Sequence, residues 1–417
     1  MIIDSHNNSL RGCVDVIVSK SQVHRLLICA ALSSRSTVIE RVQPSKDILA
    51  TVGCVNTALA DVSFKGDAVS VEPYKAFKKD CVLDCSESGS TFRMLLPVFA
   101  ALGNRCVFTG KPGLEKRPIS PLYELLSSNG CRLSEKGKFP LSLEGRLNSG
   151  RLEIDGNISS QFISGMLLAA PLLKGDTVIS VKNGIQSYPY IQMTADALRQ
   201  FKVDVEVVDK LNYKIRGGQE FVSPGKIVAE GDWSNAAFWM VAAAIGRKCD
   251  VTVKNVNLQS TQGDREIAKI LRSFGAVVEY GDKAVRVCSG RLKAVKIDAA
   301  DIPDLVPVLA VAAAAAVGKT EIVNAERLRY KESDRLETVY RLLRDLGADV
   351  KATDSALIIN GNGRLNGGVV DSYNDHRIVM AAAVASLICE NPVEIKNSEA
   401  VNKSYPRFFE EFRRLTN

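Results

Sequence analysis

One apolar, alanine-rich segment recurs six times along the 417 residues, at intervals of about seventy residues. Its copies are marked by Ala31, Ala101, Ala170, Ala244, Ala315 and Ala383. A short β-like stretch follows each copy, as in TVIE (37–40) and VEIKNS (393–398). Because the copies are apolar on nearly all faces, we expect six helices that are buried among other elements.

A second pattern lies between these copies and combines a leucine, a helical end, a turn and the entry to a strand. It reads LSSNGCRL (126–133), LRQFKVDV (198–205), LRSFGAVV (271–278) and LRDLGADV (343–350), and FEEFRRL (409–415) would be its last helix. Each unit therefore reads helix, strand, helix, strand, with extra short strands. A core stops growing at roughly 250–300 residues, so six units predict two α/β domains of three units each. The alternative is a solenoid, which we disfavour because the copies match poorly in sequence and exceed the usual period of roughly 20–50 residues.

Composition restricts the class of protein. Apolar residues make up 46% and charged residues 24% of a chain with net charge +7, which is typical of a globular protein. No block of like charges indicates a nucleic-acid partner, while small anionic substrates are compatible with the mild surplus. The longest apolar run, 305–317, is too short to cross a membrane, and no secretory signal opens the sequence.

The cysteines and histidines are too scattered to form a metal site. Ten cysteines contain no CxxC pair, and the three histidines are His6, His24 and His376. We therefore expect no metal and no cofactor, reduced thiols that are mostly in the core, and a cytoplasmic protein without a membrane partner.

Polar residues precede each Ala-rich copy. They are Ser19-Lys20-Ser21 with Arg25, Glu87-Ser88-Gly89-Ser90-Thr91 with Arg93, Ser159-Ser160-Gln161, Gly231-Asp232-Trp233-Ser234, Asp301-Ile302-Pro303-Asp304 and Asn374-Asp375-His376-Arg377. Helix capping explains the Ser, Asp and Asn residues one by one. It does not explain Lys20, Arg25 and Arg377, because positive charge opposes the dipole of a helix N-terminus. Cations near several N-termini favour an anion bound between them.

The loops before the second helices extend this cationic set with Arg117, Lys403 and the segment 329–335. On a helical turn Lys331 and Arg335 would share a face, although an exposed, ion-paired helix start is the simpler reading. Two carboxylates, Asp304 and Glu332, could transfer protons. Motifs of a nucleophilic triad or a nucleotide-binding loop are missing. The residues alone thus favour an enzyme that joins or splits two small anionic molecules.

At these loops the sequence resembles the 3-phosphoshikimate 1-carboxyvinyltransferases, also called enolpyruvylshikimate phosphate synthases. The matching motifs run in family order along the whole chain: SKSQVHR (19–25), ESGSTFR (87–93), GKPGLEKRPI (110–119), SSQF (159–162), SYPYIQMT (187–194), EGDWS (230–234), QGD (262–264), IPD (302–304), RYKESDRL (329–336), NDHR (374–377) and NKSYP (402–406). RYKESDR and NDHR are individually specific, whereas SSQF and QGD alone would be weak.

The resemblance implies that the enolpyruvyl group of phosphoenolpyruvate is transferred to the 5-hydroxyl of shikimate 3-phosphate, with release of phosphate, by addition and elimination. It implies Asp304 as the base, Glu332 as the proton donor to the methylene carbon and Lys20 close to both substrates. The implied contacts of shikimate 3-phosphate are Lys20, Ser21, Arg25, Ser159, Ser160, Gln161, Ser187, Asp304 and Lys331. Those of phosphoenolpyruvate are Lys20, Gly89, Arg117, Gln161, Arg335, Arg377 and Lys403. Tyr190 and His376 are neighbouring candidates.

The fold that the resemblance implies is a two-domain inside-out α/β barrel of six βαβαββ-type repeats, three per domain. One domain would comprise residues 1–17 and 230–417 and the other residues 18–229. The substrates would bind in the cleft of a monomer, and shikimate 3-phosphate would close it. The chain departs from the family pattern at Glu87 and Arg327. Sensitivity to glyphosate, the family's phosphoenolpyruvate-competitive inhibitor, is expected.

Two alternatives remain open at this point. One is the related enolpyruvyl transferase that acts on UDP-N-acetylglucosamine, although the loop at 110–119 lacks the cysteine usual in that group. The other is a non-catalytic anion-binding module on the same fold, against which the intact Asp304 and Glu332 argue.

Overall fold

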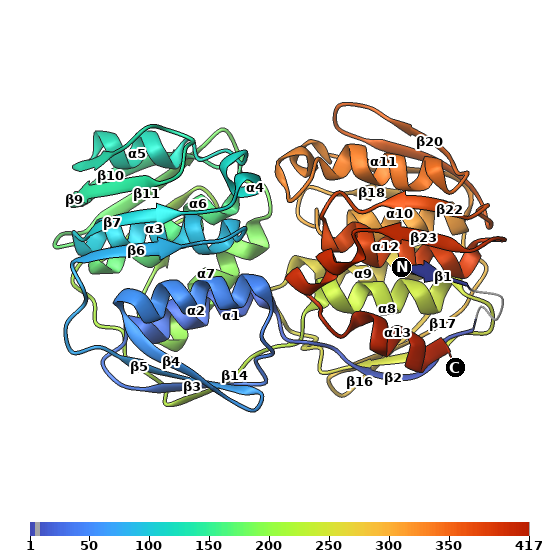
Figure 1. The fold of residues 1–417 in the computed structure, drawn as a ribbon, viewed down its shortest axis with the longest axis horizontal. Coiled ribbons are helices and arrows are strands. Elements are labelled where there is room, and N and C mark those ends of the chain that lie inside the picture. Colours follow the sequence, from blue (N-terminus) through green and yellow to red (C-terminus); the bar gives the residue numbers. More distant parts are fainter. Residues whose placement is uncertain (5–8, 417) are drawn as a thin grey trace. The chain divides into compact units, whose positions relative to one another are not determined.

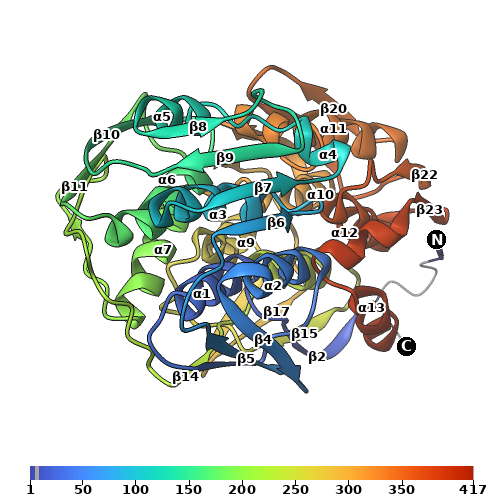
Figure 2. The same ribbon diagram turned by 60° about the vertical axis from the view of Figure 1, so that its left-hand side comes forward.

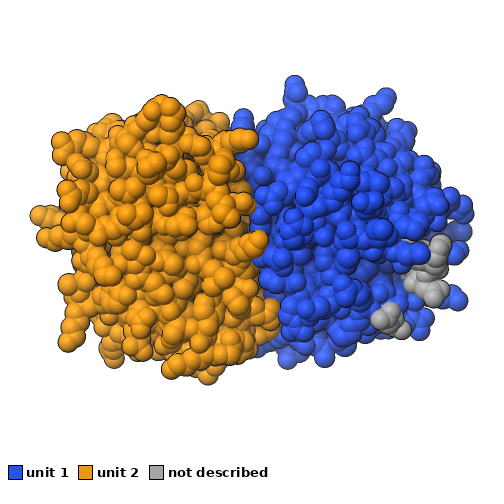
Figure 3. Space-filling view, viewed as in Figure 1, with its two compact units in different colours: residues 1–17, 230–417 blue, residues 18–229 orange. Residues whose placement is uncertain are grey.

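The computed structural model describes residues 1–4 and 9–416, so His6 lies outside the described residues. Its contacts divide the chain into two compact units, coloured separately in Figure 3. Unit 1 comprises Met1–Ile17 and Glu230–Asn417, and unit 2 comprises Val18–Ala229. Within the described residues, no helix is long and apolar enough to cross a membrane.

The prediction of six buried Ala-rich helices is confirmed. They are α1 (Lys20–Ala31), α3 (Gly89–Leu102), α6 (Ser160–Ala169), α8 (Trp233–Ile245), α10 (Val306–Ala315) and α12 (His376–Ala385). In α10, every residue from Val306 to Ala314 is buried. Small side chains let other helices and sheets approach such a helix from all sides, which explains why alanine dominates the repeat.

The second, more amphipathic helices also lie where the interleaved pattern predicts them. They are α2 (Lys46–Ala58), α5 (Leu122–Ser128), α7 (Tyr188–Gln200), α9 (Ile267–Phe274), α11 (Arg335–Asp345) and α13 (Phe408–Thr416). The segment 329–335 differs from expectation: Lys331 lies before α11 and not on a helical turn with Arg335.

Among the described residues, six small sheets accompany these helices. In unit 2 the strand orders are β14 (Lys226–Val228), β3 (Thr37–Glu40), β5 (Ala68–Pro73), β4 (Ala60–Lys65); β6 (Asp80–Asp84), β7 (Arg105–Thr109), β9 (Leu141–Gly145), β8 (Cys131–Leu133); and β10 (Gly150–Asp155), β11 (Thr177–Lys182), β13 (Asn212–Ile215), β12 (Glu206–Val207). In unit 1 they are β16 (Val277–Gly281), β17 (Ala284–Cys288), β15 (Asp250–Lys254), β2 (Arg11–Asp15); β18 (Lys296–Asp298), β19 (Val317–Val323), β21 (Leu357–Asn362), β20 (Asp349–Ala352); and β1 (Ile2–Ile3), β23 (Val393–Lys396), β22 (Gly368–Asp371).

One pairing rule unites the sheets. The strand after each Ala-rich helix pairs in parallel with a strand on one side, as β7 does with β6 and β19 with β18. In five of the sheets it pairs antiparallel with a hairpin strand on the other side. The parallel edge strand normally precedes the helix, but two edge strands are exchanged. β2 precedes α1 and pairs with β15, whereas β14 precedes α8 and pairs with β3.

Each unit has its own hydrophobic core, formed by its Ala-rich helices and the inner faces of its sheets. In unit 2, α3 packs on α6, and α1 packs on α2 and α7. In this unit β4 packs on α2, β5 on α1 and β9 on α3, and Figures 1 and 2 show these strands on the outer side of the helices that they contact. Several candidate residues lie at the N-termini of the Ala-rich helices, such as Lys20 in α1, Gly89 in α3 and Ser160 in α6.

Candidate active site

Five of the six Ala-rich helices begin with a side-chain cap. The capping residues are Ser19, Ser88, Ser159, Asp232 and Asp375. The exception is α10, whose N-cap, Leu305, has no polar side chain. Asp304, the carboxylate that the sequence analysis named as a possible base, precedes Leu305 and does not cap the helix. Its charge is therefore available to other partners.

In unit 1, Asp304 lies among three cations. It accepts hydrogen bonds from Lys331 Nζ at 3.0 Å, from Arg335 Nη1 at 2.8 Å and from Arg377 Nη2 at 3.1 Å. These cations come from the loop before α11, from the first residue of α11 and from the first turn of α12. The fold thus brings together IPD, RYKESDR and NDHR, three motifs separated in sequence.

Two further carboxylates complete this group, because Arg335 also pairs with Glu332 and with Asp375. Asp375 Oδ2 accepts from Arg335 Nε at 2.8 Å, and the guanidinium is 1% exposed. We call Asp304, Lys331, Glu332, Arg335, Asp375 and Arg377 the ion cluster. It combines three positive and three negative side chains, so the cationic surplus expected from sequence is balanced here.

The ion cluster shifts the pKa values of its members. Burial would raise the pKa of Asp304, but the charges of Arg377, Lys331 and Arg335 outweigh it and hold this pKa well below its usual range. Burial lowers the pKa of Lys331 to about 8, although Asp304 opposes the change. Asp304 is therefore ionised at neutral pH, and Lys331 is an ammonium that can lose its proton slightly above neutrality.

The remaining candidates of unit 1 lie near the cluster or on its elements. Arg377 Nη2 also donates to Ser234 Oγ at 2.8 Å. Lys403 Nζ donates to the backbone carbonyl of Asn374 at 2.8 Å, which ties it to the loop before α12. His376 is the first residue of α12 and is 1% exposed. Arg327, which departs from the family pattern, is buried, and its charge contributes to the lowered pKa of Lys331.

In unit 2, two cations of α1 have protein partners. Lys20 Nζ forms an ion pair with Asp47 Oδ2 at 2.7 Å. Arg25 is 1% exposed and donates to Thr194 Oγ1 at 2.7 Å and to Ser164 Oγ at 3.1 Å, and burial lowers its pKa to about 10. Arg25 also donates to the backbone carbonyls of Ser21 and Tyr190. These bonds fasten α1 to α6 and α7.

A second group of candidates lies at the start of α3. A Cβ added at Gly89 would be 2.8 Å from Arg117 Nη1, so these two predicted phosphoenolpyruvate contacts are adjacent. Gln161 donates to Ser90 Oγ at 2.9 Å and accepts from Arg93 Nη1 at 3.0 Å. The group therefore joins the starts of α3 and α6 to the loop before α5.

The other candidates of unit 2 occupy helix starts. Ser159 caps α6 by accepting from the Gln161 N–H at 3.3 Å, and Ser160 is the first residue of that helix. Ser187 precedes α7 with a left-handed backbone, φ 55°. Glu87, the second departure from the family pattern, is half-buried before α3.

Sequence reasoning missed several side chains that hold the candidates. Asp47 pairs with Lys20, Arg93 orients Gln161, and Asp375 orients Arg335. Asp47 carried no signal beyond an acidic residue at a helix start. Arg93 was part of the ESGSTFR motif, but the motif did not indicate its contact with Gln161. Asp375 was recognised as a cap, but the distance in sequence to Arg335 concealed the ion pair.

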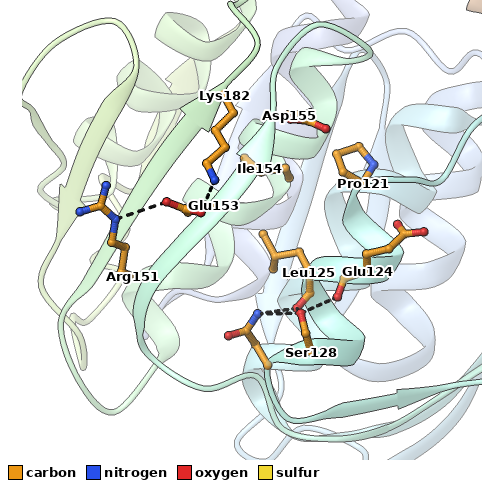
Figure 4. A pocket seen from close by; sticks show the side chains of 10 residues that line it. Pro121, Glu124, Leu125, Ser128, Arg151, Glu153, Ile154, Asp155 and Lys182 are labelled. Atoms are coloured by element: carbon orange, nitrogen blue, oxygen red, sulfur yellow. Dashed lines mark hydrogen bonds and ion pairs between the residues drawn. The ribbon is translucent and has the colours of Figure 1, made fainter.

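Elsewhere in unit 2 the surface has a hollow of about 450 Å³ between α5, β10 and β11. Figure 4 shows its charged lining, including ion pairs from Lys182 and Arg151 to Glu153. None of the candidate residues lines it. Across residues 1–4 and 9–416, no group of three or more His, Cys, Asp or Glu side chains could hold a metal ion.

Comparison with known proteins identifies a family for the chain. The family model described as EPSP synthase (3-phosphoshikimate 1-carboxyvinyltransferase) matches residues 5–412. A 3-phosphoshikimate 1-carboxyvinyltransferase of Clostridium perfringens strain 13 is 40% identical over 98% of this chain and 96% of its own. One from Clostridium acetobutylicum is 39% identical over 97% and 95% of the two chains.

Solved structures extend the likeness. An EPSP synthase of Acinetobacter baumannii has a TM-score of 0.84 and 28% identity, covering 99% of this chain and 97% of its own. The enolpyruvyl transferase NikO of Streptomyces tendae has a TM-score of 0.80 at 17% identity over 99% and 96% of the two chains, and so shares the fold. The full-length match and the identity to curated relatives lead to one conclusion: the chain belongs to the EPSP synthase family, the 3-phosphoshikimate 1-carboxyvinyltransferases.

Proposed function

We propose that this protein transfers the enolpyruvyl group of phosphoenolpyruvate to the 5-hydroxyl of shikimate 3-phosphate and releases phosphate. Family membership supports the reaction. The observation that carries the mechanism is the contact of Asp304 with Lys331, Arg335 and Arg377, because it joins a proton acceptor to three groups that bind phosphate and carboxylate. The protein thereby acts in the shikimate pathway of aromatic amino acid biosynthesis.

In the proposed mechanism, Glu332, a carboxylate paired with Arg335 before the substrates bind, takes up a proton as phosphoenolpyruvate binds Arg335. It then delivers this proton to the methylene carbon of phosphoenolpyruvate. The hydroxyl of shikimate 3-phosphate attacks the adjacent carbon as its proton passes to Asp304. The tetrahedral adduct then loses phosphate, which takes up the proton from Asp304, and returns a proton from the new methyl group to Glu332, which restores the double bond. Lys20 lies close to both substrates and stabilises the developing charge.

Substrate binding to the cations of the ion cluster makes Asp304 a better base. A carboxylate whose pKa is held low by three cations is a weak base. Phosphate and carboxylate groups of the substrates compete for Lys331, Arg335 and Arg377. As their charge is shared with the substrates, the pKa of Asp304 rises toward that of an effective base.

The binding sets are proposed as the resemblance implies them. Shikimate 3-phosphate is held by Lys20, Ser21, Arg25, Ser159, Ser160, Gln161, Ser187, Asp304 and Lys331. Phosphoenolpyruvate is held by Lys20, Gly89, Arg117, Gln161, Arg335, Arg377 and Lys403. For Arg25, four bonds to protein groups favour a role in fixing α1 beside any contact with substrate.

We also propose that the protein is a monomer in a reducing, cytoplasmic compartment. Within the described residues none of the ten cysteines forms a disulfide, and seven of them are buried, as is typical of proteins made where thiols stay reduced. Gel filtration with light scattering tests the monomer, and a dimer at micromolar concentration would overturn it.

Mass spectrometry of the reaction products tests the proposed function. The purified protein is incubated with phosphoenolpyruvate and either shikimate 3-phosphate or UDP-N-acetylglucosamine. We expect an enolpyruvyl ether of shikimate 3-phosphate and unchanged sugar nucleotide. Product only from the sugar nucleotide would show that the protein is the related transferase. No product from either acceptor would favour the non-catalytic anion-binding module.

A further inference from the structure

Three hydroxyl groups and one imidazole form a continuous chain through the core of unit 2. His24 Nδ1 lies 2.7 Å from Thr51 Oγ1, which lies 2.7 Å from Thr91 Oγ1. Thr91 Oγ1 then donates to Ser88 Oγ at 2.7 Å. All four side chains are at most 1% exposed. We call them the hydroxyl chain; it crosses from α1 through α2 to α3.

The bond from Thr91 to Ser88 sets which group donates at each step of the hydroxyl chain. Because Thr91 gives its single proton to Ser88, it accepts from Thr51, and Thr51 in turn accepts from Nδ1–H of His24. Burial lowers the pKa of His24 to about 3, so the ring is neutral and has one N–H. Its Nε2 has no hydrogen-bond partner among the described residues, so the one N–H is on Nδ1, where Thr51 accepts it.

The hydroxyl chain ends where the phosphoenolpyruvate contacts begin. Ser88 is the N-cap of α3, and its Oγ also accepts the backbone N–H of Thr91 at 3.2 Å. Gly89 is the next residue and lies against Arg117. At the other end, His24 lies one helical turn beyond Lys20 on α1.

We propose that His24, Thr51 and Thr91 are positioning residues that hold the Ser88–Gly89 turn in the conformation that binds phosphoenolpyruvate. This inference rests on the proposed function, which supplies the ligand. It concerns phosphoenolpyruvate more than shikimate 3-phosphate because α1 is fixed independently. The bonds of Arg25 to α6 and α7 hold that helix whether or not the hydroxyl chain is intact.

Valine substitutions test the proposal, since valine matches threonine in shape and lacks the hydroxyl. Thr51→Val and Thr91→Val each interrupt the hydroxyl chain. The control is Thr177→Val on β11, where an equally buried hydroxyl has no hydrogen-bond partner within the described residues. Loss of one hydrogen bond predicts a rise of about fivefold in KM for phosphoenolpyruvate, with kcat and KM for shikimate 3-phosphate unchanged. Thr91→Ser retains the hydroxyl, so its KM for phosphoenolpyruvate should equal that of wild type.

Hydrogen exchange gives a second readout that does not depend on turnover. The amides at 89–92 should exchange faster in Thr51→Val and Thr91→Val than in wild type, and Thr177→Val should match wild type. If exchange there is unchanged in both variants, or if both KM values move equally, the hydroxyl chain only stabilises the core and the proposal is wrong. A wild-type protein without turnover would refute the proposed function instead, while the exchange result would still decide whether the chain positions the turn.

Discussion

Replacing Asp304 with asparagine separates catalysis from binding. Asparagine keeps the size of the side chain and one oxygen acceptor, but it removes the negative charge that contacts Lys331, Arg335 and Arg377. It also removes the proposed base. The two consequences act on different kinetic constants, which makes the variant informative.

The magnitudes follow from the structure. Loss of a positioned general base lowers kcat by roughly 10²- to 10⁴-fold. The ion cluster changes from three carboxylates and three cations to two and three, so its net charge rises from zero to one positive unit. A more positive site does not weaken the binding of anionic substrates. We therefore expect KM for both substrates to be unchanged or lower at pH 6.5.

The pH dependence of the variant supplies an internal check. Asp304 raises the pKa of Lys331 against the effect of burial, so its removal moves that pKa further below the wild-type value of about 8. Lys331 then loses its charge nearer to neutrality. In Asp304→Asn, KM for shikimate 3-phosphate should therefore begin to rise at a lower pH than in wild type.

Steady-state phosphate release is measured between pH 6 and pH 9 for wild type, Asp304→Asn and Asp301→Asn. Asp301 is exposed and three residues upstream, which makes it a matched control for loss of a carboxylate on this loop. Turnover of Asp304→Asn within twofold of the control would refute its role as base. A rise of KM at pH 6.5 with kcat unchanged would show that Asp304 binds substrate without transferring a proton.

Three further results are expected. In wild type, kcat/KM for shikimate 3-phosphate should fall above pH 8 as Lys331 loses its proton, and a flat profile to pH 9.5 would contradict this assignment. Gly89→Ala should raise KM for phosphoenolpyruvate alone, because the new Cβ would lie 2.8 Å from Arg117 Nη1; an unchanged KM would show that Arg117 moves away freely. The pKa of His24 is about 6.5 in the unfolded chain and about 3 in the folded protein, so the protein keeps its full stability above pH 6.5. By pH 4 its free energy of unfolding should fall by about 3 kcal/mol relative to that of His24→Asn, measured by urea unfolding. Parallel pH curves for the two proteins would contradict the lowered pKa of His24.

The repeat pattern predicted the helices well because burial on all sides leaves a local signature. The six Ala-rich copies became α1, α3, α6, α8, α10 and α12, and the interleaved pattern became the second helices. The pairing of β2 with β15 and of β14 with β3 had no such signature in the spacing of residues. Strand partners depend on which surfaces the whole chain brings together, and a strand of three to five residues is equally suited to several sheets.

Site residues could be predicted where charged residues cluster within one motif. Contacts between residues far apart in the sequence could not be predicted. Asp304, Lys331 and Arg335 were expected to act together, and their side chains do meet. The role of Asp375 as a partner of Arg335 was not predicted, since forty residues separate them and a helix cap explained the aspartate completely. Buried contacts such as those of Thr51 depend on helix packing, to which short polar residues in an apolar helix give no direct guide.

Phosphate release from phosphoenolpyruvate, with and without shikimate 3-phosphate, tests the central claim most directly. Purified protein is mixed with phosphoenolpyruvate, and inorganic phosphate is followed continuously while the acceptor is added in known amounts. The account predicts no release before the addition and one phosphate for each acceptor molecule converted. Release without the acceptor, or none after it is added, would contradict the account.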